Sequence, residues 1–118
     1  MSDFRQLEVW RRSVDWTVLV YKATNTWPKD ERFGLTSQTR RAAVSVAANI
    51  AEGAGRRTAG EFLQFLGIAT GSLAEVETLL TISSRLELSP VDEIQPLMDE
   101  ARRIGRMLSG LTQSVKGR

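Results

Sequence analysis

Hydrophobic residues recur at spacings of three and four along most of the chain, which is the period of an amphipathic helix. Residues that favour turns and helix ends, chiefly proline, glycine, serine and threonine, interrupt this pattern at three places. The interruptions divide the chain into four segments. We predict helices over about residues 7–27, 35–52, 59–86 and 90–114.

The predicted helix boundaries depend on a few residues with known preferences. Pro28 ends the first helix, because proline disfavours a helical conformation in the residue before it. Thr58 and Glu61 have the spacing of a capping box, in which a hydroxyl and a carboxylate satisfy backbone N–H groups at a helix start. Ser89 followed by Pro90 is typical of a helix cap and its first residue.

Four amphipathic helices with short connections predict an all-α protein. The simplest arrangement is an antiparallel, up-down-up-down four-helix bundle. With 118 residues the chain has the length of one small domain, so we expect residues 1–118 to form a single bundle.

The first helix carries two apolar faces on nearly opposite sides. We assign the first to the core of the bundle; it consists of Leu7, Trp10, Val14, Val18 and Tyr21. The second consists of Val9, Trp16, Val20, Ala23 and Trp27. Monomers rarely leave such a large apolar patch exposed, so the second face predicts an interface between copies of this chain. The alternative is that the connector around Phe33 covers it.

The second helix is mostly small and apolar, so we expect it to be heavily buried. One line of polar residues interrupts it, at Gln38, Arg41, Ser45, Asn49 and Glu52. Arg41 and Glu52 lie about 16 Å apart along the helix axis and cannot pair with each other. Each therefore needs a partner from another helix, another subunit or a ligand. The line is either part of a binding surface or a satisfied network that fixes helix register.

Arginine dominates the basic residues. Thirteen of the sixteen are arginine, and residues 1–59 have a net charge of +4 against −2 for the remainder. Arginine suits planar, bidentate partners such as phosphate. Two adjacent pairs, Arg40 with Arg41 and Arg56 with Arg57, are our candidates for nucleic-acid binding. Solvated charges, or salt bridges between subunits, are the alternatives.

The chain contains no histidine and no cysteine. The commonest general base, the commonest metal ligand and a cysteine nucleophile are therefore missing, so we expect no catalytic residue, no metal and no cofactor. An enzyme would have to use Glu52 as a base and Arg41 to hold an anion. There is no apolar signal segment and no stretch of about 20 apolar residues, so we expect a cytoplasmic protein without a membrane partner.

From Gly34 to Leu80 the sequence contains several specific motifs. They are QxRRA at 38–42, SxxxNIAEG at 45–53, EFxxFL at 61–66 and GSLxE at 71–75. With them, the chain resembles the four-helix-bundle proteins associated with intervening sequences in 23S ribosomal RNA genes. The resemblance covers about residues 4–86, and the last helix only by pattern. That family usually has proline at the place of Ala47, so a kink expected there is absent or milder.

The resemblance implies a four-helix bundle that forms ring-shaped homopentamers, with no established enzyme activity. A more distant resemblance is to the accessory protein of diversity-generating retroelements, which works with a reverse transcriptase on nucleic acid. Together with the arginine pairs, these resemblances favour a non-enzymatic, ring-forming homo-oligomer that binds RNA or DNA, structured RNA above all. The alternative is a protein-interaction scaffold that contacts no nucleic acid.

Overall fold

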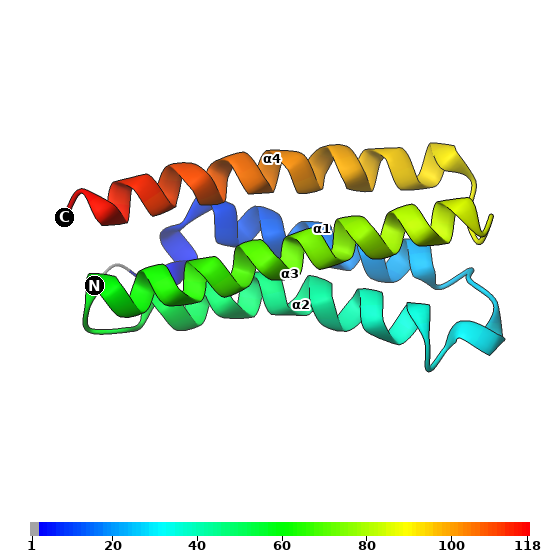
Figure 1. Cartoon of the computed structure of the whole chain (residues 1–118), viewed down its shortest axis with the longest axis horizontal. Helices are drawn as coiled ribbons and strands as arrows, with labels where there is room; N and C mark the ends of the chain where they lie inside the picture. Colours follow the sequence, from blue (N-terminus) through cyan, green and yellow to red (C-terminus); the bar gives the residue numbers. More distant parts are fainter. Residues whose placement is uncertain (1–2) are drawn as a thin grey trace.

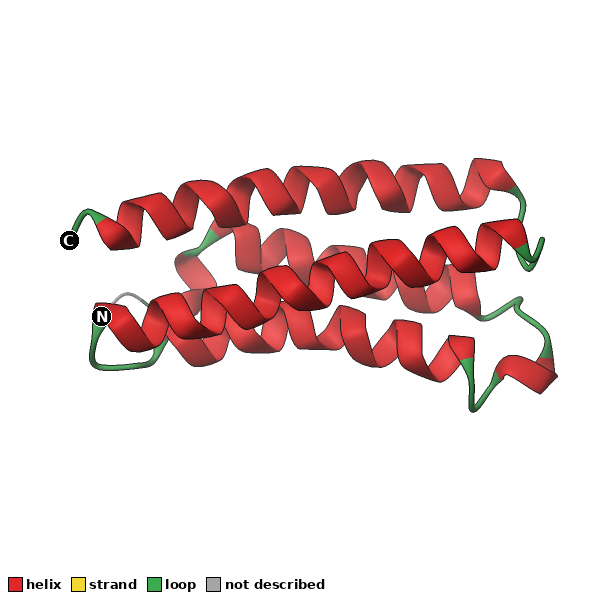
Figure 2. Cartoon of the chain, in the orientation of Figure 1, coloured by secondary structure: helices red, strands yellow, loops and turns green. Residues whose placement is uncertain are grey.

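The structure, a computed structural model, describes residues 3–118 as an all-helical chain (Figures 1 and 2). The α-helices are α1 (Glu8–Thr24), α2 (Leu35–Ala54), α3 (Ala59–Arg85) and α4 (Val91–Lys116). Two short 3-10 helices, η1 (Phe4–Gln6) and η2 (Lys29–Glu31), precede α1 and α2. No strand occurs in these residues, so the prediction of an all-α protein with four helices is confirmed.

The four helices lie side by side around one elongated core, and the backbone of the bundle extends over 45 × 23 × 19 Å. Each helix packs against two others: α1 against α2 and α4, and α3 against the same two. Figure 1 shows that the α1–α2 and α3–α4 connectors lie at one end of the molecule and the α2–α3 connector at the other. Surfaces formed by the two ends of α2 are therefore far apart.

The α2–α3 connector is short and tightly held. The Oγ1 atom of Thr58 accepts a hydrogen bond of 3.1 Å from the backbone N–H of Glu61, as the capping box predicts. Helix α2 continues through Gly53 before this connector, and a Cβ built on Gly53 would lie 2.8 Å from the Cβ of Phe65. The glycine therefore lets α2 and α3 approach closely at this end.

The opposite end differs from the sequence prediction in two details. Helix α1 stops at Thr24, and a turn places the backbone N–H of Trp27 3.0 Å from the Thr24 carbonyl oxygen. The indole Nε1 of Trp27 donates to the hydroxyl of Ser89. Ser89 does not cap α4, because the helix begins at Val91 and Pro90 occupies the cap position.

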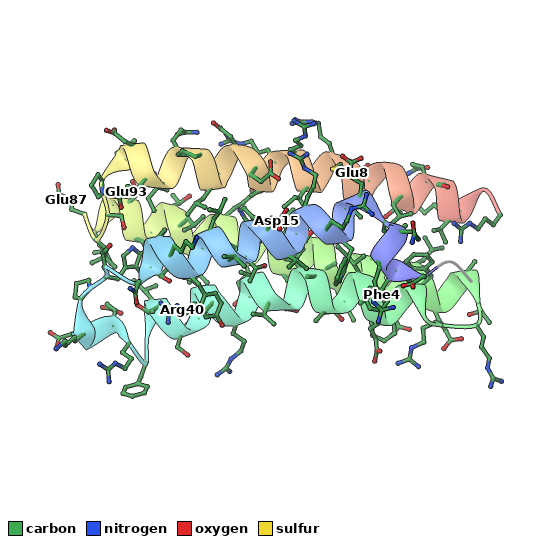
Figure 3. The ribbon with its side chains drawn as sticks, turned by 180° about the vertical axis from the view of Figure 1, so that it is seen from behind. Phe4, Glu8, Asp15, Arg40, Glu87 and Glu93 are labelled. Atoms are coloured by element: carbon green, nitrogen blue, oxygen red, sulfur yellow. The ribbon has the colours of Figure 1, made fainter. Side chains whose placement is uncertain are left out.

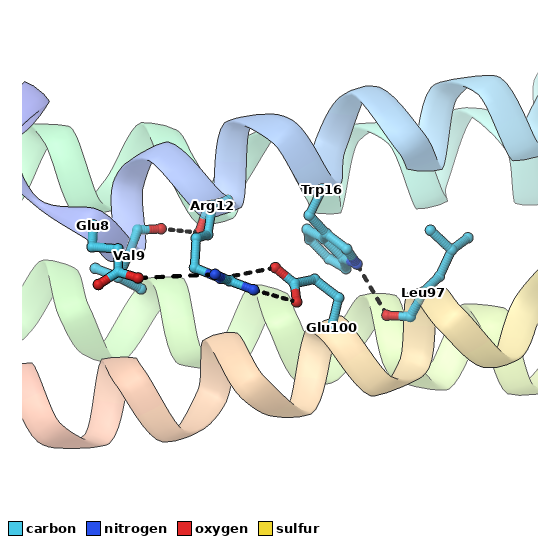
Figure 4. A network of polar contacts seen from close by, with 7 residues as sticks. Glu8, Val9, Arg12, Trp16, Leu97 and Glu100 are labelled. Atoms are coloured by element: carbon cyan, nitrogen blue, oxygen red, sulfur yellow. Dashed lines mark hydrogen bonds and ion pairs between the residues drawn. The ribbon is translucent and has the colours of Figure 1, made fainter.

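The predicted subunit interface on α1 is wrong. The large side chains assigned to it, Val9, Trp16, Val20 and Trp27, are buried in the core of their own chain, and Ala23 packs partly buried against them. Trp16 is fully buried, and its Nε1 donates to the backbone oxygen of Leu97 in α4 at 3.0 Å (Figure 4). Residues enclosed by their own bundle are not available to a second copy.

The face of α1 assigned to the core is instead the outer one. Its members Leu7, Trp10 and Val14 are only partly buried. Val18 and Tyr21 are 48% and 41% exposed. Phe33 covers neither face, because its side chain is 89% exposed. The two apolar faces of α1 thus exchange the roles that the sequence predicted for them.

An ion pair between α1 and α4 supports this orientation. The guanidinium of Arg12 donates twice to the carboxylate of Glu100, at 3.1 Å each, and lies 3.9 Å from Glu8 (Figure 4). The hydrogen bonds with Glu100 raise the pKa of Arg12 above its usual value. Bidentate pairs of this kind fix geometry as well as charge, so Arg12 holds the Trp16 face of α1 toward α4.

Candidate nucleic-acid interface

The polar line on α2 is an outer face of the bundle, not a buried one. Three of its members are exposed: Gln38, Arg41 and Glu52. The half-buried Ser45 lies with its Oγ 2.8 Å from the Oγ of Ser72 on α3. Asn49 donates to both the backbone oxygen and the Oγ of Ser45. Helix α2 is therefore buried on one side only, and the centre of the polar line is a small hydrogen-bonded network between α2 and α3.

Arg40 is fixed against the end of α1 (Figure 3). Its Nε donates to the Oγ1 of Thr24 at 2.9 Å, and one terminal nitrogen donates to the backbone oxygen of Tyr21 at 3.3 Å. The guanidinium also lies 4.7 Å from the centroid of the Tyr21 ring. A cation is favourable at a helix C-terminus, where carbonyl groups lack partners. Arg40 therefore caps α1 and keeps three of its five N–H donors unused.

Arg41 is exposed next to Arg40 and has neither a hydrogen bond nor an ion pair from its side chain within residues 3–118. A shallow groove beside it is also lined by Arg32, Phe33 and Val44. Arg32 is exposed and, in the described part of the chain, forms no ion pair. This end of α2 therefore presents a basic surface that includes a residue outside the two predicted arginine pairs.

Arg56 has a different environment at the other end of α2. Its terminal nitrogens lie 3.2 Å from the carboxylate of Glu52 and 3.9 Å from that of Glu61. Its guanidinium lies 4.7 Å from the centroid of the Phe65 ring. Two carboxylates compensate its charge. Arg57 is exposed, and no carboxylate among residues 3–118 pairs with it.

The four predicted arginines thus form two separate pairs. Sixteen residues separate Arg40 from Arg56, which corresponds to about 24 Å along a helix. Each pair contains one arginine engaged within the chain and one that is exposed and free of carboxylates in the described residues. Of these four, the two exposed arginines without a carboxylate partner in the described part of the chain, Arg41 and Arg57, therefore belong to different ends of the bundle (Figure 1).

An apolar groove lies between α1 and α2, beside the basic surface of Arg41. It has a volume of about 300 Å³ and is lined by Trp10, Val14, Thr17, Val18, Val44, Ala47 and Ala48. Helix α2 runs without a break through Ala47. Val18 and Val44 are 48% and 45% exposed. This groove is the apolar surface that the bundle leaves uncovered on α1 and α2.

Comparison with known proteins identifies the family. Residues 5–110 match the family described as 23S rRNA-intervening sequence protein. The chain belongs to this family. This member of the 23S rRNA-intervening sequence protein family has the fold of a protein of unknown function from the S23 ribosomal protein family of Bacteroides thetaiotaomicron VPI-5482, with a TM-score of 0.80.

The likeness to that structure shows the fold alone, because the two chains are 22% identical. It covers 88% of this chain and 97% of the other. No curated protein matches the chain. Neither description indicates an enzyme family. Within residues 3–118 no group of acidic side chains is arranged to hold a metal ion. In the same residues, α3 alone is long and apolar enough to cross a membrane, a property that the core helices of other folded proteins share.

Proposed function

We propose that this protein acts without catalysis, as an antiparallel, up-down-up-down four-helix bundle that assembles into a homo-oligomeric ring in the cytoplasm and binds nucleic acid, above all structured RNA. The observation that carries the proposal is that Arg41 and Arg57 are both exposed and lack carboxylate partners within residues 3–118. Arg40 and Arg56 support the same surfaces, with fewer free donors.

The apolar groove between α1 and α2 is the surface we assign to assembly. It replaces the buried Trp16 face as the candidate interface. Partly exposed valines on both helices border it, and a different surface of a second copy, packed into the groove, would bury them by the hydrophobic effect. The family resemblance implies a ring of five subunits, in which each bundle would contribute the groove on one side and another surface on the other, because rings are built from head-to-tail interfaces.

A ring would make weak phosphate contacts effective. One protomer offers Arg41 and Arg57, and each phosphate contact of an exposed arginine is weak and sensitive to salt. Linking several copies makes later contacts intramolecular, so the affinity of the ring exceeds that of the protomer. A large excess of positive charge is therefore not needed, which agrees with the net charge of +2.

The assembly is tested with the double substitution Val18→Gln and Ala48→Gln, measured by sedimentation velocity. Glutamine keeps helix propensity and adds no charge, but it places polar groups in the groove. We expect the double variant to sediment as a folded protomer. The matched control is Ile68→Gln on α3, at a residue with 45% exposure, and it should remain assembled. Loss of assembly in the control alone would place the interface on α3 and contradict the assignment.

Nucleic-acid binding is tested by fluorescence anisotropy with structured RNA and with duplex DNA, across a salt series and against a polyanion competitor. We expect binding to structured RNA that persists near physiological salt and resists the competitor. A basic protein binds almost any polyanion at low salt. Binding that disappears at that salt, or that equals binding to the competitor, would overturn the proposal.

A scaffold without nucleic-acid contact is the second candidate. The observation that favours it is the position of Arg41 beside the apolar groove, where a carboxylate of a second copy could pair with it. In that case Arg41→Gln dissolves the assembly, and RNA binding is absent from the start. An intact assembly in this variant would remove the support for the scaffold.

A further inference from the structure

A cavity of about 270 Å³ lies where the connector from α1 enters α2. Its lining contains three cations and two threonine hydroxyl groups, and it contains no carboxylate. The lining residues are Thr24, Asn25, Trp27, Pro28, Lys29, Arg32, Thr36 and Arg40. A concave site with three positive charges is suited to an anion of small size.

One of the three cations, Arg40, is held in place before any ligand arrives. Arg40 is held by its hydrogen bonds to Thr24 and Tyr21, and its remaining N–H donors are unused. Lys29 and Arg32 are exposed on the connector side, and within residues 3–118 neither forms an ion pair. The connector also carries Asp30 and Glu31, neither of which lines the cavity; the Oε1 of Glu31 accepts the backbone N–H of Leu35 at 3.1 Å.

Thr36 supplies an independent indication of a ligand. Its side chain lines the cavity and is 7% exposed. Its Oγ1 is the one buried side-chain polar atom in the described residues that lacks a hydrogen-bond partner. Buried hydroxyls are nearly always paired, so this atom calls for an acceptor or donor from outside the chain. Thr36 also lies in the first turn of α2, where the helix dipole favours negative charge.

We propose that this cavity binds the phosphate group of a phosphate monoester. A terminal phosphate carries close to two negative charges and three acceptor oxygens. A phosphate held by Arg40 and Arg32 would place acceptor oxygens next to Thr36, whose hydroxyl has no partner in the described residues. The volume lies just below the range of roughly 300–1,000 Å³ that is usual for small-molecule sites, so it admits the phosphate and part of the group that carries it. This site goes beyond the proposed nucleic-acid surface, because its ligand is a terminal phosphate and because it adds Lys29 from the connector; Arg32, Thr36 and Arg40 border both sites.

The direct test is titration of the full chain with inorganic phosphate, followed by ¹H–¹⁵N NMR in near-physiological chloride. We expect saturable shifts in the backbone signals around Thr36. Arg32→Gln should weaken binding about tenfold or more, since a hydrogen bond to a charged group is lost. Thr36→Val should also weaken it several-fold and leave the thermal stability unchanged or higher, because the lost hydroxyl has no partner in the chain.

Arg103→Gln is the matched control, since Arg103 is an exposed arginine on α4 that lies outside the cavity. It should bind phosphate as the wild type does. Phosphate binding that is unsaturable, or that Arg32→Gln, Thr36→Val and Arg103→Gln leave equal to wild type, would overturn the proposal. So would binding of phosphate no tighter than chloride.

Two sources of the monoester are separated by a second set of probes. The probes are glycerol phosphate and one short RNA, prepared with a 5′-phosphate or with a 5′-hydroxyl. Tighter binding of the 5′-phosphorylated RNA, displaced by inorganic phosphate, supports the site and assigns it to nucleic-acid ends. Equal binding of both RNAs, with glycerol phosphate bound, supports the site and assigns it to small molecules. Failure of the 5′-hydroxyl RNA to bind counts against the proposed nucleic-acid function and leaves the cavity proposal standing.

Discussion

The two ends of α2 each carry an adjacent pair of arginines, yet they differ in what surrounds the charge. At the α2–α3 end, Glu52 and Glu61 compensate Arg56, and the aromatic ring of Phe65 lies against its guanidinium. At the α1–α2 end, Arg40 contacts only a hydroxyl, a backbone oxygen and an aromatic ring. One end uses its arginine to order a short loop, and the other keeps its positive charge uncompensated.

The difference follows from the positions of the carboxylates and not from the arginines themselves. Glu52 lies four residues before Arg56 on the same helix, and the capping box adds Glu61. No carboxylate occupies the equivalent position before Arg40, where Thr36 stands. Arginine pairs that look alike in a sequence therefore differ in the charge they offer a ligand.

The largest effect that we predict is a loss of stability when the packing is changed at the end of α2 that carries Arg56. Gly53→Ala places a Cβ 2.8 Å from the Cβ of Phe65 and 3.0 Å from the Phe62 ring. We expect a loss of about 1–3 kcal/mol in the free energy of unfolding, measured with urea, because an overpacked site must shift. Gly67→Ala is the control: its Cβ meets no heavy atom within 4 Å, and it should raise stability by about 0.4–1 kcal/mol. Equal stability of the two variants would contradict the close approach.

The second prediction compares how much RNA binding depends on arginines without a carboxylate partner and on Arg56, whose charge two carboxylates compensate. The double substitution Arg41→Gln and Arg57→Gln should weaken binding to structured RNA about tenfold and flatten its salt dependence, since each lost phosphate contact lowers the slope by about 0.7–0.9. Arg56→Gln should change both quantities less, because Glu52 and Glu61 already neutralise that residue. The measurement is anisotropy across a salt series. A larger loss in Arg56→Gln than in the double variant would reverse the comparison.

The smallest effect that we predict follows when Arg56 loses its ion pair with Glu52 and becomes free to contact RNA. Glu52→Gln removes the nearer carboxylate at constant size, and surface pairs of this kind contribute about 0.3–0.5 kcal/mol to stability. We expect a small loss of stability and tighter RNA binding by about twofold. Glu75→Gln, on the exposed surface of α3, has the same change in net charge and should leave RNA binding closer to wild type. If both variants tighten binding equally, net charge and not Arg56 is responsible.

The helices could be predicted from the sequence because their start and stop residues are local. The assignment of the two apolar faces of α1 failed for a physical reason. The buried face includes Ser13 and Thr24, and with them it forms an unbroken series at residues 9, 13, 16, 20, 24 and 27. Their hydroxyls donate to Val9 at 2.7 Å and Val20 at 2.9 Å within the same helix. The hydroxyls of such residues are already hydrogen-bonded within their own helix when they enter the core, so a pattern that leaves them out does not recognise this face as the core face.

The contacts in the candidate site are also of two kinds, those that local sequence spacing predicts and those that it does not. The pairing of Glu52 with Arg56 follows from a spacing of four on one helix and could have been predicted. Arg40 instead reaches Thr24 and Tyr21, which lie 16 and 19 residues earlier in the chain. That contact depends on the path of the connector, which local preferences do not determine. For the same reason no motif marked Arg32 or Thr36.

The central claim is that arginines repeated around a ring bind nucleic acid. The most direct test is the salt dependence of RNA affinity for the wild type and for the charge-neutral variant Val18→Gln, Ala48→Gln, with folding of both checked by circular dichroism. We predict a slope of log affinity against log salt that is much steeper for the wild type, because several protomers contribute phosphate contacts at once. Equal slopes for the assembled and dissociated proteins, or no binding by the wild type at physiological salt, would contradict the account.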